Sequence, residues 1–410
     1  MRRRLNTLLP LFFFTVAILM GCSTIRSGWD KAMMSLNRSV AITTKPDPNR
    51  PHYDHLYVLG DSLSDIGVLL GSVNQIWEEM RRNVSFTRVL LFPTRLYFKS
   101  PFYRNCSFSN GPLAVEYLAG KLNLSLQPAW RYYLTDTQEE DLAEEALRAQ
   151  QNKSKDFLIN GKAHYKSEML SQYGTNYATA GAMIAQGNSL PYMVYLNQFN
   201  LTKQLNALVR QHPSFKKRDL FVIIIGGNDL IYITDIKKSG DQKTNLILAD
   251  IHSLQENIIY LIKKGARHII VGNVPDISLT PRYIDKDYKR KLAKCFVQLF
   301  NKELETMVDF LIMKYPTVDI KLFDLNKIFV DYLASPKNQQ NITRPCIKDV
   351  FSSFNSVFNL NTFLVGGFLA NYIGTCNQKN IDNYPFFDSI HPTAALHEQV
   401  GNALYKLVKD

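Results

Sequence analysis

Short runs of apolar residues recur along the chain, and most of them end at a glycine. Such runs occupy residues 56–59, 220–225, 268–271 and 318–323, and a glycine directly follows each of the first three. A short continuous apolar run that stops at a turn residue is typical of a strand buried on both faces. Strands of this kind belong to parallel sheets that helices cover on both sides.

Between these runs the apolar residues follow a helical period. The pattern predicts helices over residues 196–209, 246–262, 290–313 and 394–408. Strands that alternate with helices imply right-handed crossovers and a mainly parallel sheet. A hydrophobic fraction of 46% with 20% charged residues excludes a disordered or fibrous chain. The sequence therefore predicts an α/β protein with a three-layer α/β/α fold, whose ligands bind outside the carboxyl ends of the strands.

The first residues have the pattern of an export signal. Three arginines at positions 2–4 precede an apolar stretch at 8–20 that is too short for a comfortable membrane span. We predict a signal peptide over residues 1–21, of the lipoprotein type, because its end resembles a bacterial lipobox with Cys22 as the lipidation site. An ordinary signal peptide cleaved nearby is the alternative. In either case the protein is expected to be exported, as an outer-membrane lipoprotein or as a secreted protein.

The rest of the chain is expected to form a tether and one folded domain. The polar, proline-containing residues 22–54 have the composition of a tether. The domain itself is predicted over residues 55–410. It is expected to carry insertions near residues 72–109, 130–170 and 335–384, where the strand and helix patterns are interrupted.

The chain is basic, with a formal net charge of +12, of which the predicted signal peptide contributes three. The remaining excess is spread along the sequence. Such a surface tolerates anionic partners, and we expect one of them to be the lipid head groups of a membrane surface. The export signal and the lack of a concentrated basic stripe argue against nucleic acid as a partner.

Besides Cys22 the chain has four cysteines, which allow three pairings in an oxidising compartment. Cys346 and Cys376 flank a single stretch rich in Phe, Asn and Gly, and are the natural pair for closing a loop. Cys295 lies in an amphipathic run and is expected to be a buried small hydrophobic residue. Cys106 is either free or paired with Cys295. The cysteine spacings do not resemble a zinc site.

Ser62 is the first candidate for chemistry. It follows the first predicted strand at a Gly-Asp turn and precedes an apparent helix at residues 66–70. A serine in this place is exposed at the sheet edge, where a nearby helix N-terminus favours a developing negative charge. The hydroxyl needs a base to act as a nucleophile. The alternative is a simple helix N-cap, and Ser64 excludes the Gly-x-Ser-x-Gly elbow.

Asp388 and His391 supply such a base just before the last predicted helix. A carboxylate three residues ahead of a histidine can bend back to accept the Nδ1 proton. That contact fixes the tautomer in which Nε2 takes a proton from a serine. For an isolated Asp-x-x-His pattern the alternative is a helix cap with Pro392 in the first turn.

Two further segments could stabilise negative charge. Residues 226–229 follow the strongest strand, and their glycines would let the backbone approach a ligand while the Asn228 amide donates to an oxyanion. Residues 176–182 place the Gly181 N–H where a second donor could lie. The alternative for residues 226–229 is an ordinary turn at a strand end.

In this order, residues 60–65, 176–182, 226–229 and 388–391 resemble the four sequence blocks of the GDSL, or SGNH, hydrolases. The resemblance extends from residue 56 to the end of the chain. Further matching elements lie at 108–112, 265–268 and 273–276. It implies the flavodoxin-like α/β/α fold of that family, with a mainly parallel sheet and loop insertions.

The resemblance also implies a role for each matching residue. Ser62 would be the nucleophile, His391 the general base and Asp388 its orienting acid. The oxyanion hole would consist of the backbone N–H groups of Ser62 and Gly181 and the Asn228 side chain. Asp65 matches a family position as well, and we expect its role to be structural, in support of the turn.

The export signal, the chain length and the late cysteine-flanked insertion resemble secreted bacterial phospholipase A, lysophospholipase and glycerophospholipid:cholesterol acyltransferase enzymes. This implies a serine esterase that cleaves phospholipids or lysophospholipids through an acyl-serine intermediate, with cholesterol as a further acceptor. The Cys346–Cys376 loop would be either a lid over an acyl groove or a packed part of the fold.

Three other functions remain as alternatives. A carbohydrate O-acetylesterase and a thioesterase share the fold, and a non-catalytic surface binding module is the alternative from another class. No cofactor is predicted. A metal-dependent hydrolase is disfavoured because Asp388 and His391 have no third ligand at a recognisable spacing.

Overall fold

The computed structural model describes residues 46–72, 74, 97–129, 174–185, 199–339, 341–349 and 367–409. The predicted signal peptide, the lipidation site at Cys22 and the predicted insertion at 130–170 lie outside these residues, as do most of the tether and parts of the other two insertions. Every helix among the described residues is too short or too polar to span a bilayer.

The centre of the described residues is a sheet of four parallel strands. They are β1 (His55–Gly60), β3 (Asp219–Ile224), β4 (His268–Gly272) and β5 (Asp319–Phe323), in the spatial order β1-β3-β4-β5. Each predicted apolar run forms one of these strands. Because all four are parallel, their carboxyl ends lie at the same edge of the sheet.

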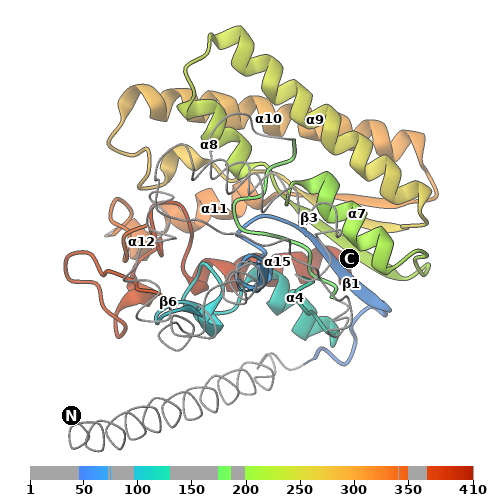
Figure 1. Ribbon diagram of the computed structural model, residues 1–410, viewed down its shortest axis with the longest axis horizontal. Helices are drawn as coiled ribbons and strands as arrows, with labels where there is room; N and C mark the ends of the chain where they lie inside the picture. The colour runs from blue at the N-terminus through green and yellow to red at the C-terminus, as the bar shows by residue number, and fades with distance from the viewer. Residues whose placement is uncertain are drawn as a thin grey trace, which may run out of the picture.

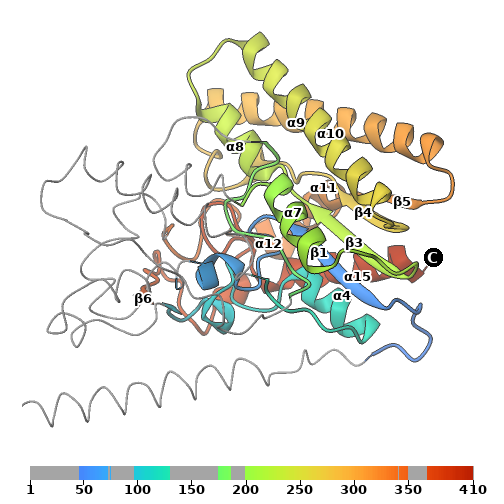
Figure 2. The ribbon, with the colours of Figure 1, turned by 45° about the vertical axis from the view of Figure 1, so that its right-hand side comes forward.

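Helices cover both faces of the sheet, as the three-layer prediction requires (Figures 1 and 2). Successive residues of a strand point to opposite faces. Tyr57 and Leu59 therefore pack in one apolar cluster, and Leu56 and Val58 pack in another. Helices α7 (Leu201–Gln211), α8 (Gly227–Asp235), α9 (Gly240–Lys263) and α10 (Asp287–Lys314) bound the first cluster. Helices α4 (Ala114–Leu122), α11 (Leu325–Ala334) and α15 (Ala394–Lys409) bound the second.

Several short strands and helices lie outside the four-stranded sheet and its covering helices. β2 (Tyr97–Phe98) and β6 (Gly367–Phe368) form a separate two-stranded parallel sheet among the described residues. The short helices are η1 (Tyr103–Asn105), η3 (Ile277–Leu279), α12 (Pro336–Gln339) and η4 (Ile381–Asn383).

Two helices, α7 and α9, begin where a side chain caps them, several residues away from the start that the hydrophobic pattern predicted. α9 begins six residues before the predicted start, at 240 instead of 246, because Ser239 and Gln242 form a reciprocal capping box. α7 begins at 201 instead of 196, because the Asn200 side chain accepts a hydrogen bond from the Lys203 N–H at 3.0 Å. Capping residues therefore set these boundaries, while the apolar period sets the buried face.

The prediction that Cys295 is buried is wrong. Its side chain is exposed, and both Cys295 and Cys106 are free cysteines. The buried residues of α10 near this point are Ala293, Phe296, Val297 and Phe300, so position 295 lies outside the buried stripe. The free state of Cys106 agrees with one of the two alternatives left by the sequence.

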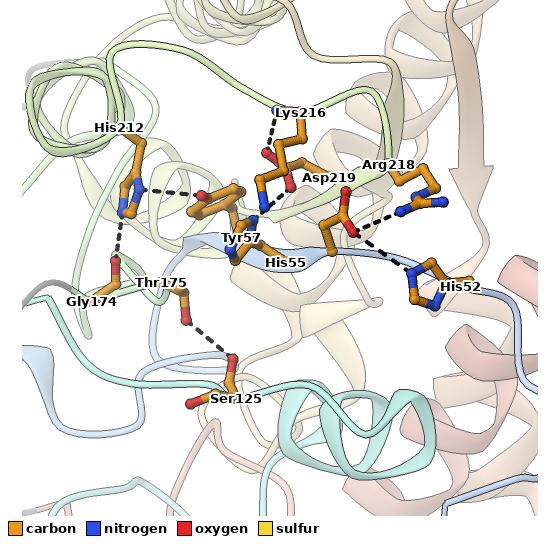
Figure 3. Close-up of polar contacts among 11 residues, drawn as sticks. His52, His55, Tyr57, Ser125, Gly174, Thr175, His212, Lys216, Arg218 and Asp219 are labelled. Atoms are coloured by element: carbon orange, nitrogen blue, oxygen red, sulfur yellow. Dashed lines mark hydrogen bonds and ion pairs between the residues drawn. The ribbon is translucent and has the colours of Figure 1, made fainter.

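Polar contacts join the amino ends of β1 and β3, at the opposite end of the sheet from the residues with candidate chemistry (Figure 3). His55 Nδ1 lies 2.8 Å from the buried Asp219 carboxylate. The Tyr57 hydroxyl lies 3.2 Å from Nδ1 of His212, whose Nε2 lies 3.2 Å from the carbonyl oxygen of Gly174. These contacts hold the start of the sheet together with the segment that leads to residues 175–179.

Candidate active site

Ser62 lies in a tight turn directly after β1. A side chain at Gly60 would place its Cβ 2.2 Å from the Ile224 carbonyl oxygen, so only glycine allows β1 and β3 to approach this closely. The Ser64 N–H then donates to the Asp61 carbonyl oxygen at 3.0 Å and closes the turn. The Ser62 hydroxyl is thereby presented at the carboxyl edge of the sheet.

Asp65 stabilises this turn through hydrogen bonds to the backbone. Its buried carboxylate accepts hydrogen bonds from the N–H groups of residues 67–69, at 2.8, 2.6 and 3.1 Å, and from Ala180 N–H at 2.8 Å. The helix after the turn consequently begins at residue 68, two residues later than the sequence predicted. Burial raises the pKa of Asp65 to about 6, and the four hydrogen bonds oppose that rise. The residue joins the Ser62 turn to the segment that contains Gly181.

The structure brings Ser62, His391 and Asp388 together in one chain of hydrogen bonds. His391 Nε2 lies 2.7 Å from Ser62 Oγ, and His391 Nδ1 lies 2.6 Å from Asp388 Oδ2. The other oxygen of Asp388 accepts from the backbone N–H groups of Ile390 and His391, at 3.0 and 2.8 Å. The carboxylate thus bends back over three residues, and the serine and the histidine come from segments 329 residues apart.

Burial and ion pairing together set the pKa values of Asp388 and His391. Burial alone would raise the pKa of Asp388, but the charge of His391 and the hydrogen bonds to the carboxylate bring it below its usual range. Burial would lower the pKa of His391, but the charge of Asp388 and the hydrogen bond to it raise that pKa. An ionised Asp388 can only accept, so His391 Nδ1 carries the proton and Nε2 accepts from the Ser62 hydroxyl.

The histidine segment is held from several sides. The Phe387 N–H donates to the His391 carbonyl oxygen at 2.8 Å, and the Asn110 side chain accepts from the Ala394 N–H at 2.9 Å. The ring of Phe108 lies 4.9 Å from the His391 ring, centroid to centroid. Residues 108–112, which the sequence analysis singled out, therefore support the histidine and the start of α15.

Of the three predicted oxyanion donors, Ser62 and Asn228 come directly after β1 and β3, and Gly181 follows a segment that runs beside β1. Residues 175–179 run beside β1, since the Val58 N–H donates to the Thr175 carbonyl oxygen at 2.9 Å. This pairing delivers Gly181, with φ of 82°, to the carboxyl end of the sheet. The Asn228 side-chain amide donates one hydrogen to the Ala182 carbonyl oxygen at 2.9 Å, and among the described residues its second hydrogen has no protein acceptor.

A cavity opens at this edge, and Ser62, Asn228 and His391 all line it. The buried Asp61 lines it as well, and burial raises the pKa of that carboxyl to about 6. Most of the wall is apolar and comes from the end of β3, from α11 and from the start of α15. Representative residues are Leu63, Ile224, Leu325, Phe329, Leu396 and Val400. The cavity therefore places a nucleophile and hydrogen-bond donors beside space for an apolar group.

Cys346 and Cys376 form a disulfide bond, with their Cα atoms 5.3 Å apart. The segment that begins at Cys346 reaches the histidine segment, because the Asp349 carboxylate accepts two hydrogen bonds from Ser389. No pattern in the sequence pointed to Asp349. Its contact spans 40 positions, and only the placement of the disulfide segment beside residues 386–389 brings the two together.

Comparison with known proteins shows which family the chain resembles. The sequence matches the family described as GDSL-like Lipase/Acylhydrolase over residues 56–404. Phosphatidylcholine-sterol acyltransferase of Aeromonas hydrophila is 23% identical over 381 residues, which cover 87% of this chain and 91% of that protein.

Other relatives match over shorter stretches. Anther-specific proline-rich protein APG of Brassica napus is 26% identical over 261 residues, covering 59% of this chain and 54% of that protein. The secreted effector protein SseJ of Salmonella typhimurium is 26% identical over 180 residues, covering 44% and 38%. The chain spans about half the length of the anther-specific relatives, 54% of one and 46% of its Arabidopsis thaliana counterpart.

Proposed function

Because the chain belongs to the GDSL-like lipase/acylhydrolase family, we propose that it is a serine esterase with Ser62, His391 and Asp388 as its catalytic triad. The observation that carries this proposal is the continuous set of hydrogen bonds from Ser62 Oγ through His391 to Asp388, at 2.7 and 2.6 Å. It opens on a cavity with a largely apolar wall. A binding module would need neither the serine–histidine contact nor the fixed tautomer.

The first half of the reaction forms an acyl-serine. Ser62 Oγ attacks the ester carbonyl carbon while its proton passes to His391 Nε2. The resulting oxyanion accepts hydrogen bonds from the Asn228 amide and from the backbone N–H groups of Ser62 and Gly181. The tetrahedral intermediate then expels the alcohol, which takes its proton from His391. Asp388 stabilises the imidazolium that exists between these two transfers.

The second half reverses these steps with a new acceptor. Water attacks the acyl carbon, His391 takes its proton, and the released acid leaves Ser62 with its hydroxyl restored. Another alcohol can replace water, and the product is then a new ester. The same residues therefore serve hydrolysis and acyl transfer, and access of water or alcohol decides between them.

We propose phospholipids and lysophospholipids as the substrates. The acyl chain would occupy the apolar cavity between the sheet, α11 and α15, since burying each methylene there contributes about 0.8 kcal/mol. One further observation supports this choice. The relative from Aeromonas hydrophila is named for phosphatidylcholine and a sterol, and its match covers 87% of this chain. We propose cholesterol as a further acceptor on the same ground.

We also propose that the protein is exported. The arginines and apolar stretch at the start of the chain support this, as does the similarity to a secreted effector protein. In the lipoprotein form that the sequence predicts, a lipid on Cys22 would hold the active site near a membrane. Labelling with a radioactive or clickable fatty acid, in the wild type and in Cys22→Ser, tests the anchor directly.

The decisive experiment measures fatty acid release from phosphatidylcholine and lysophosphatidylcholine, with and without cholesterol. We expect free fatty acid from at least one lipid, and cholesteryl ester when sterol is present. Release of acetate from an acetylated sugar, with neither lipid cleaved, would keep the triad but contradict the lipid substrate. Release of fatty acid without any cholesteryl ester in the presence of cholesterol would contradict cholesterol as an acceptor and leave the lipid substrate unaffected.

Asn228→Ala is expected to lower kcat by about 10²–10³, with little change in KM, because an oxyanion donor acts mainly in the transition state. The assay is steady-state hydrolysis of a soluble ester. The substitution also removes the contact to the Ala182 carbonyl oxygen, so the thermal unfolding midpoint is measured in parallel. A rise in KM with kcat unchanged would mean that Asn228 binds substrate in its ground state and is no oxyanion donor.

Val400→Phe is expected to shift the preference of the enzyme to shorter acyl chains. Val400 lines the cavity from α15, and the loss of space for one methylene costs about 10-fold or more in kcat/KM for long chains. The assay compares esters of increasing chain length. Val408→Phe is the matched control, because Val408 lies on the same helix, is similarly buried and does not line the cavity. Equal chain-length profiles for the two variants would place the acyl chain elsewhere.

A further inference from the structure

Asp349 binds the short stretch of chain between the acid and the base of the proposed triad. Its Oδ1 accepts the Ser389 backbone N–H at 2.9 Å, and its Oδ2 accepts the Ser389 hydroxyl at 2.7 Å. Ser389 follows Asp388 directly and precedes His391 by two positions. One carboxylate therefore occupies both donors of the residue whose backbone conformation relates Asp388 to His391.

The position of Asp349 is itself well defined. The residues before it, 346–348, run between two other segments. On one side the N–H groups of Cys346 and Ile347 donate to the carbonyl oxygens of residues 386 and 387, at 3.0 and 2.8 Å. On the other side Ile347 pairs with Tyr372 in an antiparallel bridge, and Cys346 carries the disulfide bond. Cys346 and Ile347 are fully buried, so the carboxylate is presented to Ser389 by a fixed backbone.

Asp388 depends on the conformation that Asp349 holds. Asp388 Oδ1 accepts from the backbone N–H groups of Ile390 and His391, and only then does Oδ2 reach His391 Nδ1 at 2.6 Å. A change in the backbone at Ser389 would move these two donors relative to the carboxylate. Asp349 has no direct contact with the imidazole ring, so it would act through Ser389 and through its charge.

We infer that Asp349 is a positioning residue for the catalytic histidine, which holds the Asp388–His391 turn through Ser389 and adds a negative charge beside it. The inference rests on the proposed function. Three other groups bear on His391: Ser62 and Asp388 by hydrogen bonds, and Asp61 by charge. His397, on α15, is buried and its pKa is lowered to about 3, so it stays neutral.

The charge of Asp349 has a measurable consequence. Burial lowers the pKa of His391, and the charges of Asp388, Asp349 and Asp61 raise it. His391 must be neutral to take the serine proton, so activity falls as the pH drops through its pKa. Loss of the Asp349 charge lowers that pKa, and the acid limb of the pH profile therefore moves to lower pH.

Asp349→Asn tests this inference, because asparagine keeps the shape and can still pair with Ser389 while the charge is lost. We expect the acid limb of kcat/KM for a soluble p-nitrophenyl ester to move to lower pH. We also expect kcat to fall about 10-fold to 100-fold with KM nearly unchanged, because the amide offers Ser389 a single uncharged acceptor oxygen in place of the two charged ones. Ser389→Ala keeps the charge and should lower kcat without moving the acid limb.

Asp331→Asn is the matched control. Asp331 is an exposed aspartate on α11 that pairs with Lys327 at 2.6 Å, and the same chemical change there should alter neither kcat nor the pH profile. An Asp349→Asn enzyme with normal kcat and an unmoved acid limb would overturn the inference. A lower unfolding midpoint with kcat per folded molecule and acid limb both unchanged would overturn it too, because the role would then be structural alone. Failure of the proposed function is distinguishable, since the wild type would then not cleave the ester.

Discussion

Ser62→Ala is expected to lower kcat by on the order of 10⁶ while the protein stays folded, as removal of the nucleophile does in serine proteases that use the same triad. The reason is that no acyl-serine can form without Oγ, although the cavity and the oxyanion donors remain. The Ser62 side chain is nearly buried and its hydroxyl contacts His391, so a methyl group in its place costs little packing. The measurement is steady-state ester hydrolysis together with thermal unfolding.

Ser64→Ala is the matched control for this prediction. Ser64 lies two positions further in the same turn, and its buried hydroxyl has no hydrogen-bond partner in the described part of the chain. Its loss should therefore leave both activity and the unfolding midpoint near the wild-type values. Normal turnover in Ser62→Ala would contradict the assignment of the nucleophile. Equal losses in the two variants would show that the turn as a whole, and no single hydroxyl, had been damaged.

Much of the fold follows from the sequence, for a physical reason. The runs that became β1, β3 and β4 are buried on both faces and are apolar at nearly every position, whereas β5 lies at the edge of the sheet and buries only some of its residues. The carboxyl ends of parallel strands lie at one edge of the sheet, so the polar residues that follow these strands come together at that edge. Ser62 and Asn228 follow β1 and β3 in this way and line one cavity.

The rest of the site depends on contacts that a linear pattern does not encode. Gly181 reaches the edge because residues 175–179 pair beside β1, although they carry no strand-like apolar run. Asp349 reaches Ser389 only through the placement of the disulfide segment. The helix after Ser62 starts late because Asp65 binds the N–H groups of residues 67–69.

The exposed Cys295 shows a second limit of pattern reading. An amphipathic run predicts that a helix has a buried face, but a single small residue at its border can fall on either side. The burial of Phe296 and Phe300 decides the orientation of α10 and leaves Cys295 in solvent. Large aromatic side chains therefore outweigh a neighbouring cysteine in setting which side of a helix is buried.

Asp388→Asn is expected to lower kcat by about 10⁴, because an amide can donate to His391 Nδ1 and so favours the wrong tautomer. The structure adds a second expectation. Asp388 raises the pKa of His391 by its charge and hydrogen bond. Without that charge the pKa falls, so the residual activity should persist to lower pH than in the wild type. The measurement is the pH profile of kcat/KM for a soluble ester, at enzyme concentrations high enough to record the slow variant.

The comparison with Asp349→Asn separates the two carboxylates. Asp388 contacts the imidazole directly at 2.6 Å, whereas Asp349 acts through Ser389. The loss in kcat should therefore be much larger for Asp388→Asn, while both variants shift the acid limb in the same direction. An Asp388→Asn enzyme with nearly normal kcat would mean that another group orients His391. A loss in Asp349→Asn as large as that in Asp388→Asn would instead make the two carboxylates equal members of one buried acid pair.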